Sequence, residues 1–555
     1  MSETEQCYTG GEILVQALQL HGVDRIFCVP GESYLAVLDA LVDAPDIAIT
    51  ICRHESGAAM MAEAYGKCTG RPGICFVTRG PGATNAMAGI HIADQDSTPV
   101  IMFIGQVGRG AMEREAFQEI DYRRVCGSLC KWVAQIDQPQ RIAEMVGRGF
   151  YTATAGRPGP VILALPEDML TEQAVPVPAR RYERVEPGLS ADFLERIRKL
   201  LSGAERPFVL IGGGGWTEAA CAQLQRFAEA WELPVGVSFR CQGYFDALHP
   251  NYAGDVGLGI NPALVKCIQD SDVILAIGPR LGEATTNGYT LLNVPLPRQT
   301  LIHIHADAEE LGSVYQPALA VNAGMNATTN ALASLTAPAA RSWSCRTRTI
   351  NDAYHAWTTP PSNPGPLQMG EVICWLNANL PPDSIIANGA GNFAIWPNRF
   401  YRYRRYRSML APTSGSMGYG VPAGVAAKLM YPQRTVVTFA GDGCFLMTGQ
   451  ELATAVQYDA QVVFIVVNNG TYGTIRMHQE REYPGRVSGT ELRNPNFVKL
   501  ADAYGAHGER VEHTREFAPA FERAMAAGRP AVIELILDKE VIAPGLTISG
   551  LRSAR

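Results

Sequence analysis

The sequence lacks the features that mark several large classes of protein. No apolar run approaches the roughly 20 residues that a helix needs to cross a bilayer, so we expect no membrane partner. The polar start, MSETEQCYTGG, does not have the pattern of a signal peptide. Basic runs are also absent and the formal net charge is −7, which argues against nucleic acid as a partner.

Paired cysteines are missing as well. The thirteen Cys residues are scattered through apolar segments, without the C-x-x-C spacing that is typical of a metal site. Reduced, buried thiols are the simplest interpretation, because a free Cys behaves as a small apolar residue. Such thiols persist in a reducing compartment, and we therefore expect a cytoplasmic protein.

What the sequence does contain is typical of a large folded protein. It has 555 residues, of which 47% are apolar and 18% charged, enough for about three domains. Two stretches rich in Pro and Gly interrupt it, at residues 176–188 and 359–366. Short β-branched runs alternate with helical segments, which predicts an α/β fold of doubly wound parallel sheets. The predicted domains cover residues 1–180, 190–355 and 366–555.

The clearest pattern is a strand–helix–strand unit in the last third of the chain. Two apolar runs, Val436–Ala440 and Val462–Val467, predict buried strands, and Thr448–Tyr458 predicts a helix between them. A crossover of this kind makes the two strands parallel. Asp442 and Asn469 would then lie just past the carboxyl ends of the strands, where open α/β sheets bind ligands.

The residues expected at that edge suit a metal ion and a phosphate group. Carboxylate and carboxamide oxygens are hard ligands for Mg²⁺, which takes about one or two protein carboxylates and completes its shell with phosphate oxygens. Gly441 and Gly443 flank Asp442, where a side chain would keep phosphate away from the backbone. A lone Gly-Asp-Gly is more often an ordinary tight turn, but the pair Asn468-Asn469 favours a diphosphate site.

This Gly-Asp-Gly followed by Asn-Asn resembles the motif of thiamine-diphosphate-dependent enzymes, and the resemblance covers essentially the whole chain. It implies pyrimidine-binding, central nucleotide-binding-like and diphosphate-binding domains, in that order. It also implies thiamine diphosphate held through a Mg²⁺ ion, whose ligands would be the side chains of Asp442 and Asn469 and the carbonyl of Thr471. The further cofactor contacts that it implies are Pro30, Gly31, Gly391, Asn392, Ser416, Met417, Gly441, Gly443, Tyr472 and Gly473.

Two of these predicted contacts need qualification from the sequence itself. Met417 lies in a segment similar to the loop whose Met forces the two rings of thiamine into a bent shape, but core packing is the other interpretation. Asn392 and Phe393 stand where the family has Gln and His, so any phosphate contact through Phe393 must come from its backbone.

Glu55 is the predicted catalytic residue. A carboxylate at a helix start is commonly explained by the helix dipole. The segment RHESGAAMMAEAYG, however, looks like the one that presents a glutamate to the aminopyrimidine ring in these enzymes. The resemblance implies that Glu55 exchanges a proton with ring N1′, which favours the tautomer that removes the thiazolium C2 proton.

A third set of residues is expected to line a substrate channel. Residues 78–85, TRGPGATN, are similar to the SGPGATN loop of the acetolactate synthase branch, with Arg79 in place of the serine. In that branch the matching Gln, Phe and Lys residues line the channel and orient a 2-oxo acid. Phe117 in the core and Lys131 as a solvated charge are the alternatives. The predicted channel residues are Gln106, Phe117, Gln118, Lys131, Arg280 and His478.

The central segment departs from the acetolactate synthase pattern. Gly212–Gly215 suggests a dinucleotide site but lacks the spaced fingerprint and an acidic partner. Gly278–Glu283 stands where GARFDDR is expected, and His303-Ile304-His305 replaces an acidic stretch. The carboxylates that would serve the adenosine half of a flavin are missing, so FAD stays open. His478 stands where that branch often has a Trp, which leaves the choice of acceptor open.

The resemblance predicts a carboligase that decarboxylates a 2-oxo acid such as pyruvate and joins the acyl unit to a second carbonyl, another 2-oxo acid or an aldehyde. The alternatives are an aldehyde lyase, a decarboxylase that does not ligate, such as an oxalyl-CoA-type enzyme, and a flavin-dependent oxidase. A non-catalytic nucleotide-binding protein is the alternative from another class. A homodimer or homotetramer is implied, because the family's cofactor lies between two subunits. The tail, residues 542–555, could fold over the site as a lid.

Overall fold

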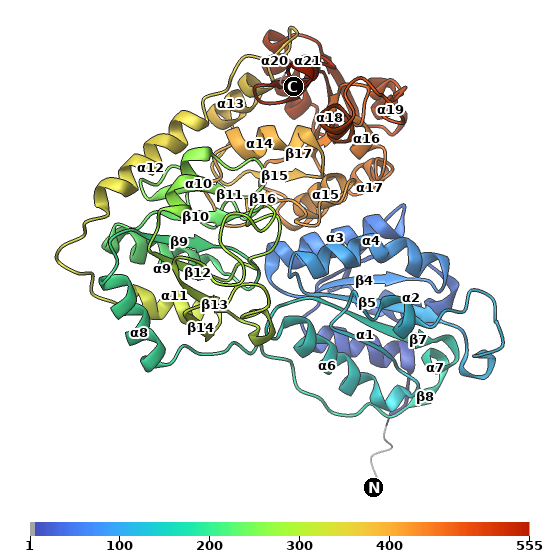
Figure 1. Cartoon of the computed structure of the whole chain (residues 1–555). Coiled ribbons are helices and arrows are strands. Elements are labelled where there is room, and N and C mark those ends of the chain that lie inside the picture. The colour runs from blue at the N-terminus through green and yellow to red at the C-terminus, as the bar shows by residue number, and fades with distance from the viewer. Residues whose placement is uncertain (1–5, 554–555) are drawn as a thin grey trace. The chain divides into compact units, whose positions relative to one another are not determined.

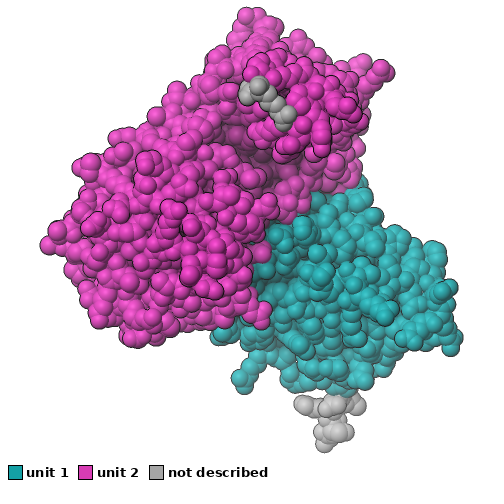
Figure 2. Space-filling model, viewed as in Figure 1, with its two compact units in different colours: residues 1–185, 425–430 teal, residues 186–424, 431–555 magenta. Residues whose placement is uncertain are grey.

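The computed structural model describes residues 6–553 (Figure 1). The chain forms two compact units, residues 1–185 with 425–430 and residues 186–424 with 431–555 (Figure 2). Residues 1–5 of the chain start that we expect not to be a signal peptide lie outside the described residues. Between residues 6 and 553, no helix is both long and apolar enough to span a bilayer. No disulfide joins any of the thirteen Cys residues, all of which lie in this range.

The first unit contains a six-stranded parallel sheet in the order β3-β2-β4-β5-β7-β6. Its first helix begins at Gly10, because Thr9 accepts a hydrogen bond from the backbone of Glu12 and the Glu12 side chain accepts from the backbone of Thr9. The strands are β1 (Tyr8–Thr9), β2 (Arg25–Cys28), β3 (Ala48–Ile51), β4 (Gly73–Val77), β5 (Val100–Gln106), β6 (Trp132–Gln135), β7 (Pro160–Pro166) and β8 (Gln173–Ala174), and the helices are α1 (Gly10–Leu20), α2 (Leu35–Ala40), α3 (Glu55–Thr69), α4 (Pro81–Gln95), α5 (Tyr122–Cys126), α6 (Ile142–Thr154) and α7 (Glu167–Thr171).

The second unit begins with another six-stranded parallel sheet, in the order β11-β10-β9-β12-β13-β14. Both faces are covered, since Val209 and Ile211 of β9 belong to one apolar cluster and Phe208 and Leu210 to another. Its elements are α8 (Ala191–Ser202), β9 (Pro207–Ile211), α9 (Glu218–Trp231), β10 (Val235–Ser238), β11 (Tyr252–Val256), α10 (Pro262–Gln269), β12 (Val273–Ile277), β13 (Thr300–His305), β14 (Leu319–Asn322), α11 (Met325–Ala333) and α12 (Ser344–Trp357).

A third six-stranded parallel sheet follows in the order β16-β15-β17-β18-β20-β19. Its elements are α13 (Met369–Asn379), β15 (Ile385–Asn388), α14 (Ile395–Phe400), β16 (Met409–Leu410), α15 (Gly420–Met430), β17 (Val436–Gly441), α16 (Asp442–Phe445), α17 (Glu451–Gln457), β18 (Val462–Asn468), α18 (Gly473–Glu482), α19 (Phe497–Ala503), β19 (His507–Val511), α20 (Phe517–Ala526), β20 (Ala531–Ile536), β21 (Val541–Ala543), β22 (Leu546–Thr547) and α21 (Ile548–Ser553). The predicted fold class, three doubly wound α/β domains, is confirmed. The predicted domain boundaries stay predictions.

One predicted helix differs from the helix observed. The helix predicted over Thr448–Tyr458 is shorter, α17, and a separate turn of helix, α16, begins at Asp442 itself. Helix α3 begins at Glu55, because the ring of His54 caps it by accepting from the backbone of Ser56. Glu55 therefore lies inside the first turn of α3.

The chain ends in a small hairpin, β21 and β22, followed by α21. Arg552 of α21 donates two hydrogen bonds of 2.9 Å to Glu480 of α18, a side chain that is 1% exposed. The tail is thereby attached to the helix that follows the predicted metal loop. Its role as a lid stays a prediction, and residues 554–555 lie outside the described part.

Candidate active site

The carboxyl edge of the third sheet brings together the two predicted metal ligands. β17 and β18 are parallel neighbours, with Gly441 opposite Val467. Asp442 follows β17 directly, and Asn469 follows β18. This placement confirms the strand–helix–strand prediction. Their roles as metal ligands stay predictions.

Asp442 is 3% exposed and is held by three hydrogen-bond donors. Its Oδ1 accepts from the N–H of Gly443 at 2.8 Å. Its Oδ2 accepts from the N–H of Gly470 at 2.8 Å and from Nδ2 of Asn494 at 2.7 Å. Burial raises the pKa of Asp442, and these hydrogen bonds oppose the rise. A cation on this carboxylate would offset the cost of its burial, so the arrangement fits a hard metal ion.

Asn494 is a site residue that sequence reasoning missed. The backbone of Thr471 pairs with that of Glu491 in an antiparallel bridge, and the N–H of Tyr472 donates to the carbonyl of Thr490 at 2.9 Å. This pairing brings Asn494 against Asp442. No motif marks Asn494, because the contact depends on how a distant loop folds back.

The other predicted metal ligands lie in the same loop. Oδ1 of Asn469 accepts from the N–H of Thr471 at 3.2 Å, which leaves that oxygen a second lone pair for a cation. Thr471 is 7% exposed, and its hydroxyl donates to the carbonyl of Thr490 at 2.9 Å. The hydroxyl is thus used within the protein, and a metal contact from Thr471 would come from its carbonyl, as predicted.

The glycines of this edge are required by close packing. A Cβ added at Gly441 would lie 2.9 Å from the ring of Phe393, and one added at Gly443 would lie 2.5 Å from the ring of Tyr472. Gly391 has a φ of +143° and also faces the Phe393 ring. Asn392 is held by α18, because its Oδ1 accepts from the hydroxyl of Thr474 at 2.8 Å.

The loop with Ser416 and Met417 lies before α15. Met417 is half-buried. The N–H of Gly418 donates to Sγ of Cys444 in α16 at 3.2 Å, which attaches this loop to the turn that begins with Asp442. Its predicted contact with thiamine stays a prediction. His478, in α18, is exposed.

In the first unit, Glu55 is the first residue of α3 and is half-buried. Its Oε2 accepts a hydrogen bond from Nδ2 of Asn85 at 3.0 Å. Asn85 belongs to α4, which begins inside the TRGPGATN loop, so this loop supplies a partner that the sequence did not assign. Gly82 of the same helix faces the other oxygen, with a Cβ position 3.4 Å from Oε1.

Pro30 and Gly31 lie in the turn after β2, on the same sheet. A Cβ added at Gly31 would lie 2.4 Å from Cβ of Thr78, which follows β4. β2 and β4 are neighbours although β3 comes between them in the chain, so this turn lies at the point where the strand order reverses.

Arg79 contacts the loop that carries two of the predicted channel residues, Phe117 and Gln118. Its guanidinium donates to Glu32 at 3.2 Å, to Glu167 at 3.0 Å and to the carbonyl of Phe117 at 3.2 Å. Phe117 is 73% exposed, which excludes the core alternative. Gln118 has a φ of +66° and packs against Gly80. A buried arginine therefore holds the backbone of the loop that carries two predicted channel residues.

The remaining channel residues of this unit are engaged with the backbone. Gln106 is 4% exposed, with Nε2 donating to the carbonyl of Ile120 at 3.0 Å and Oε1 accepting from the N–H of Val107 at 3.0 Å. Both ends of its amide hold the chain, so its observed role is structural and its place in a channel stays a prediction. Lys131 is exposed, and its Nζ donates to the carbonyl of Ala155.

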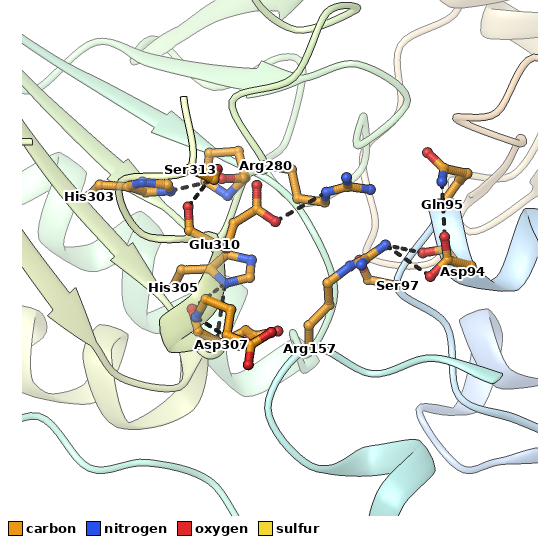
Figure 3. Close-up of polar contacts among 12 residues, drawn as sticks. Asp94, Gln95, Ser97, Arg157, Arg280, His303, His305, Asp307, Glu310 and Ser313 are labelled. Atoms are coloured by element: carbon orange, nitrogen blue, oxygen red, sulfur yellow. Dashed lines mark hydrogen bonds and ion pairs between the residues drawn. The ribbon is translucent and has the colours of Figure 1, made fainter. Parts of the chain in front are cut away.

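At the carboxyl edge of the central sheet, the polar side chains contact other groups of the protein (Figure 3). Nε2 of His303 lies 3.0 Å from the carbonyl of Pro279, and burial lowers the pKa of His303 to about 4. Nε of Arg280 lies 3.3 Å from Oε2 of Glu310. The nearest carboxylates are used within the protein, because Glu310 is paired with Arg280 and Oδ1 of Asp307 accepts from the N–H of Glu309 at 3.0 Å.

Comparison with known proteins decides the family. Residues 8–125, 194–332 and 389–535 match the N-terminal TPP binding domain, the central domain and the C-terminal TPP binding domain of thiamine pyrophosphate enzymes. The chain belongs to the thiamine pyrophosphate enzymes. Thiamine pyrophosphate, which is thiamine diphosphate, is therefore its cofactor.

This thiamine pyrophosphate enzyme is similar over nearly its whole length to proteins named acetolactate synthase. It is 33% identical to the probable acetolactate synthase large subunit of Methanocaldococcus jannaschii, over 95% of this chain and 92% of the relative. It is 32% identical to the mitochondrial acetolactate synthase of Schizosaccharomyces pombe, over 97% and 84%. Identity to the isozyme 2 large subunit of Escherichia coli K12 is 29%, over 96% of each chain.

Proposed function

We propose that this thiamine pyrophosphate enzyme decarboxylates a 2-oxo acid such as pyruvate and joins the remaining acyl unit to a second carbonyl compound. The observation that carries the proposal is the match to proteins named acetolactate synthase over 95% or more of the chain. The acceptor is a second 2-oxo acid or an aldehyde. When bound, the cofactor supplies the acyl-anion chemistry that an ordinary side chain cannot provide.

Asp442, Asn469 and Thr471 would hold a Mg²⁺ ion that binds the diphosphate. Asp442 contributes the single carboxylate, Asn469 its side-chain oxygen and Thr471 its carbonyl, a set that suits an ion completed by phosphate oxygens. The segments that would line the cofactor are those of Gly391 and Asn392, Ser416 and Met417, Gly441 and Gly443, and Tyr472 and Gly473.

Glu55 would accept and return a proton at N1′ of the aminopyrimidine ring. Its Oε2 is occupied by Asn85, which orients the carboxylate and leaves Oε1 for the ring. Pro30 and Gly31 would pass close to the ring, because the turn that they form lies at the reversal of strand order. These residues act by holding the ring and moving a proton, which is general acid–base work.

Flavin is not part of this proposal, because the side chains at the central carboxyl edge contact other groups of the protein. An aldehyde lyase and a decarboxylase that does not ligate remain the alternatives among enzymes. The names of the relatives favour ligation over both. A non-catalytic nucleotide-binding protein would not need Glu55.

We also propose a homodimer or homotetramer and a cytoplasmic location. The assembly rests on the family resemblance, in which one subunit presents the glutamate and another the metal loop. Size-exclusion chromatography with light scattering tests it, and an active monomer would contradict it.

The test of the reaction is the product spectrum. The purified enzyme is incubated with Mg²⁺, thiamine diphosphate and pyruvate, with and without an aldehyde, and the products are identified by NMR. Acetolactate or an acyloin is expected. The matched control is Glu55→Gln, which should form neither. Free acetaldehyde as the sole product would overturn the carboligase proposal in favour of a simple decarboxylase.

A further inference from the structure

Asp442 stands at one end of a series of side-chain hydrogen bonds whose other end is a second buried acid, Glu534. Glu534 lies in β20, the strand beside β18, and is 1% exposed. Its Oε1 accepts from Nδ2 of Asn468 at 2.7 Å. Oδ1 of Asn468 accepts from Nδ2 of Asn494 at 2.9 Å, and the same Nδ2 donates to Oδ2 of Asp442 at 2.7 Å.

The chemistry of the two acids fixes the direction of every bond in this series. Oε1 of Glu534 accepts from Nδ2 of Asn468, so the amino group of Asn468 faces Glu534. The oxygen of Asn468 therefore faces Asn494, and it also accepts from the N–H of Gly470 at 3.1 Å. The amino group of Asn494 has two hydrogens, one for Asn468 and one for Asp442. A flip of either amide would place donor against donor or acceptor against acceptor.

We propose that Glu534 is a positioning residue for Asp442, which it orients through Asn468 and Asn494. Oδ2 of Asp442 receives two donors, from Gly470 and Asn494, whereas Oδ1 receives one, from Gly443. The less occupied oxygen, Oδ1, is then the one presented to the cation. This inference rests on the proposed Mg²⁺ site and adds residues that touch neither the metal nor the cofactor.

Glu534→Gln keeps the shape of the side chain. It no longer fixes which way the amide of Asn468 points. A glutamine amide presents either an oxygen or an amino group to Asn468, so the Asn468 amide can turn and place its amino group against that of Asn494. Residues that support metal ligands in this way change metal affinity by about 10–100-fold. We therefore expect Glu534→Gln to raise the Mg²⁺ concentration needed for half-maximal binding of thiamine diphosphate by roughly that factor.

A matched control separates this role from the ion pair that Glu534 forms with Arg510. Oε2 of Glu534 lies 3.8 Å from Nη1 of Arg510, a partly exposed pair that does not involve Asn468. Arg510→Gln removes that pair and leaves the bond from Asn468 to Glu534 in place. Its Mg²⁺ requirement should equal that of the wild type.

The experiment is calorimetric titration of the full-length apoenzyme with thiamine diphosphate at a series of Mg²⁺ concentrations. An unchanged requirement in Glu534→Gln, beside a wild type that binds, would overturn the inference and leave the proposed function standing. A wild type that takes up no thiamine diphosphate with Mg²⁺ would instead overturn the proposed metal site. If circular dichroism shows Glu534→Gln unfolded, Glu534→Asp replaces it, because the shorter side chain withdraws from Asn468.

A double variant tests whether the residues act in one series. Asn494→Ala should also raise the Mg²⁺ requirement. Glu534→Gln added to Asn494→Ala should change little more, because the connection to Asp442 is already lost. Two effects that multiply would show that Glu534 acts by a separate route and would overturn the proposal.

Discussion

The first and third sheets of this enzyme have the same strand order, but the acidic side chains of the proposed site, Glu55 and Asp442, have different surroundings. Numbered within each sheet, both follow the strand order 2-1-3-4-6-5, whereas the central sheet follows 3-2-1-4-5-6. In the third sheet, Asp442 is buried and receives three hydrogen bonds. In the first, Glu55 is half-buried and Asn85 donates to one of its oxygens. One strand order thus supports a fixed acid and a more accessible one.

The difference corresponds to the two tasks that we propose. A metal ligand must keep one orientation, and several donors together provide it. An acid that exchanges a proton needs an oxygen open to its partner, and a single amide donor leaves that oxygen available. At the carboxyl edge of the central sheet, by contrast, the polar side chains contact other groups of the protein.

Glu55→Gln should produce the largest effect on turnover. It should also distinguish most clearly between the proposed roles of Glu55 and Asp442. A glutamine keeps the size of the side chain but cannot take up the proton, so we expect the product-forming rate to fall by about 10²–10⁴-fold. Binding of thiamine diphosphate should stay within a few-fold of the wild type. Steady-state kinetics and calorimetry on the same preparation measure both, and retained turnover would show that Glu55 is only a helix-dipole residue.

Arg79→Ser tests whether the loop beside Glu55 depends on one buried side chain. The variant restores the residue of the acetolactate synthase branch and removes the bonds to Glu32, Glu167 and Phe117. Because each bond of this type contributes roughly 1 kcal/mol when partly exposed, we expect a several-fold rise in KM for the 2-oxo acid. Thiamine diphosphate affinity should not change. An unaltered KM, together with unaltered proteolysis of residues 107–121, would contradict this role.

Glu480→Gln addresses the tail beside the metal loop and should give the smallest effect. The bonds from Arg552 hold the pKa of Glu480 at about 2, below its ordinary 4.5, aided by the N–H of Gly485 and the charge of Arg476. A lowered pKa stabilises the fold above pH 4.5, and this contribution is lost as the pH falls from 4.5 toward 2. The variant should lower Tm by roughly 1–3 °C at pH 7.

The pH series provides the check on that assignment. The difference in Tm between wild type and Glu480→Gln should be constant from pH 7 to about 5 and shrink below pH 4.5. A difference that grows as the pH falls would show that the ion pair with Arg552 is not the cause.

The sequence predicted the parts of this structure that local pattern controls. The strands that precede Asp442 and Asn469 were predictable, because an apolar run determines the structure of its own segment. Asn85, Asn494 and Glu534 were not, since each meets its partner through folding of distant segments. Gln106 is the opposite case. Its segment matches a motif of the family, but the motif does not reveal that both ends of its amide bond to the backbone.

Thiamine diphosphate uptake by Asp442→Ala is the most direct test of the claim that a metal ion at this edge holds the cofactor. Calorimetry of the wild type should show binding with Mg²⁺ that is lost when EDTA removes the ion. Asp442→Ala, folded by circular dichroism, should bind weakly whether or not Mg²⁺ is present. Equal binding by the wild type and the variant, with the same dependence on Mg²⁺, would contradict the account.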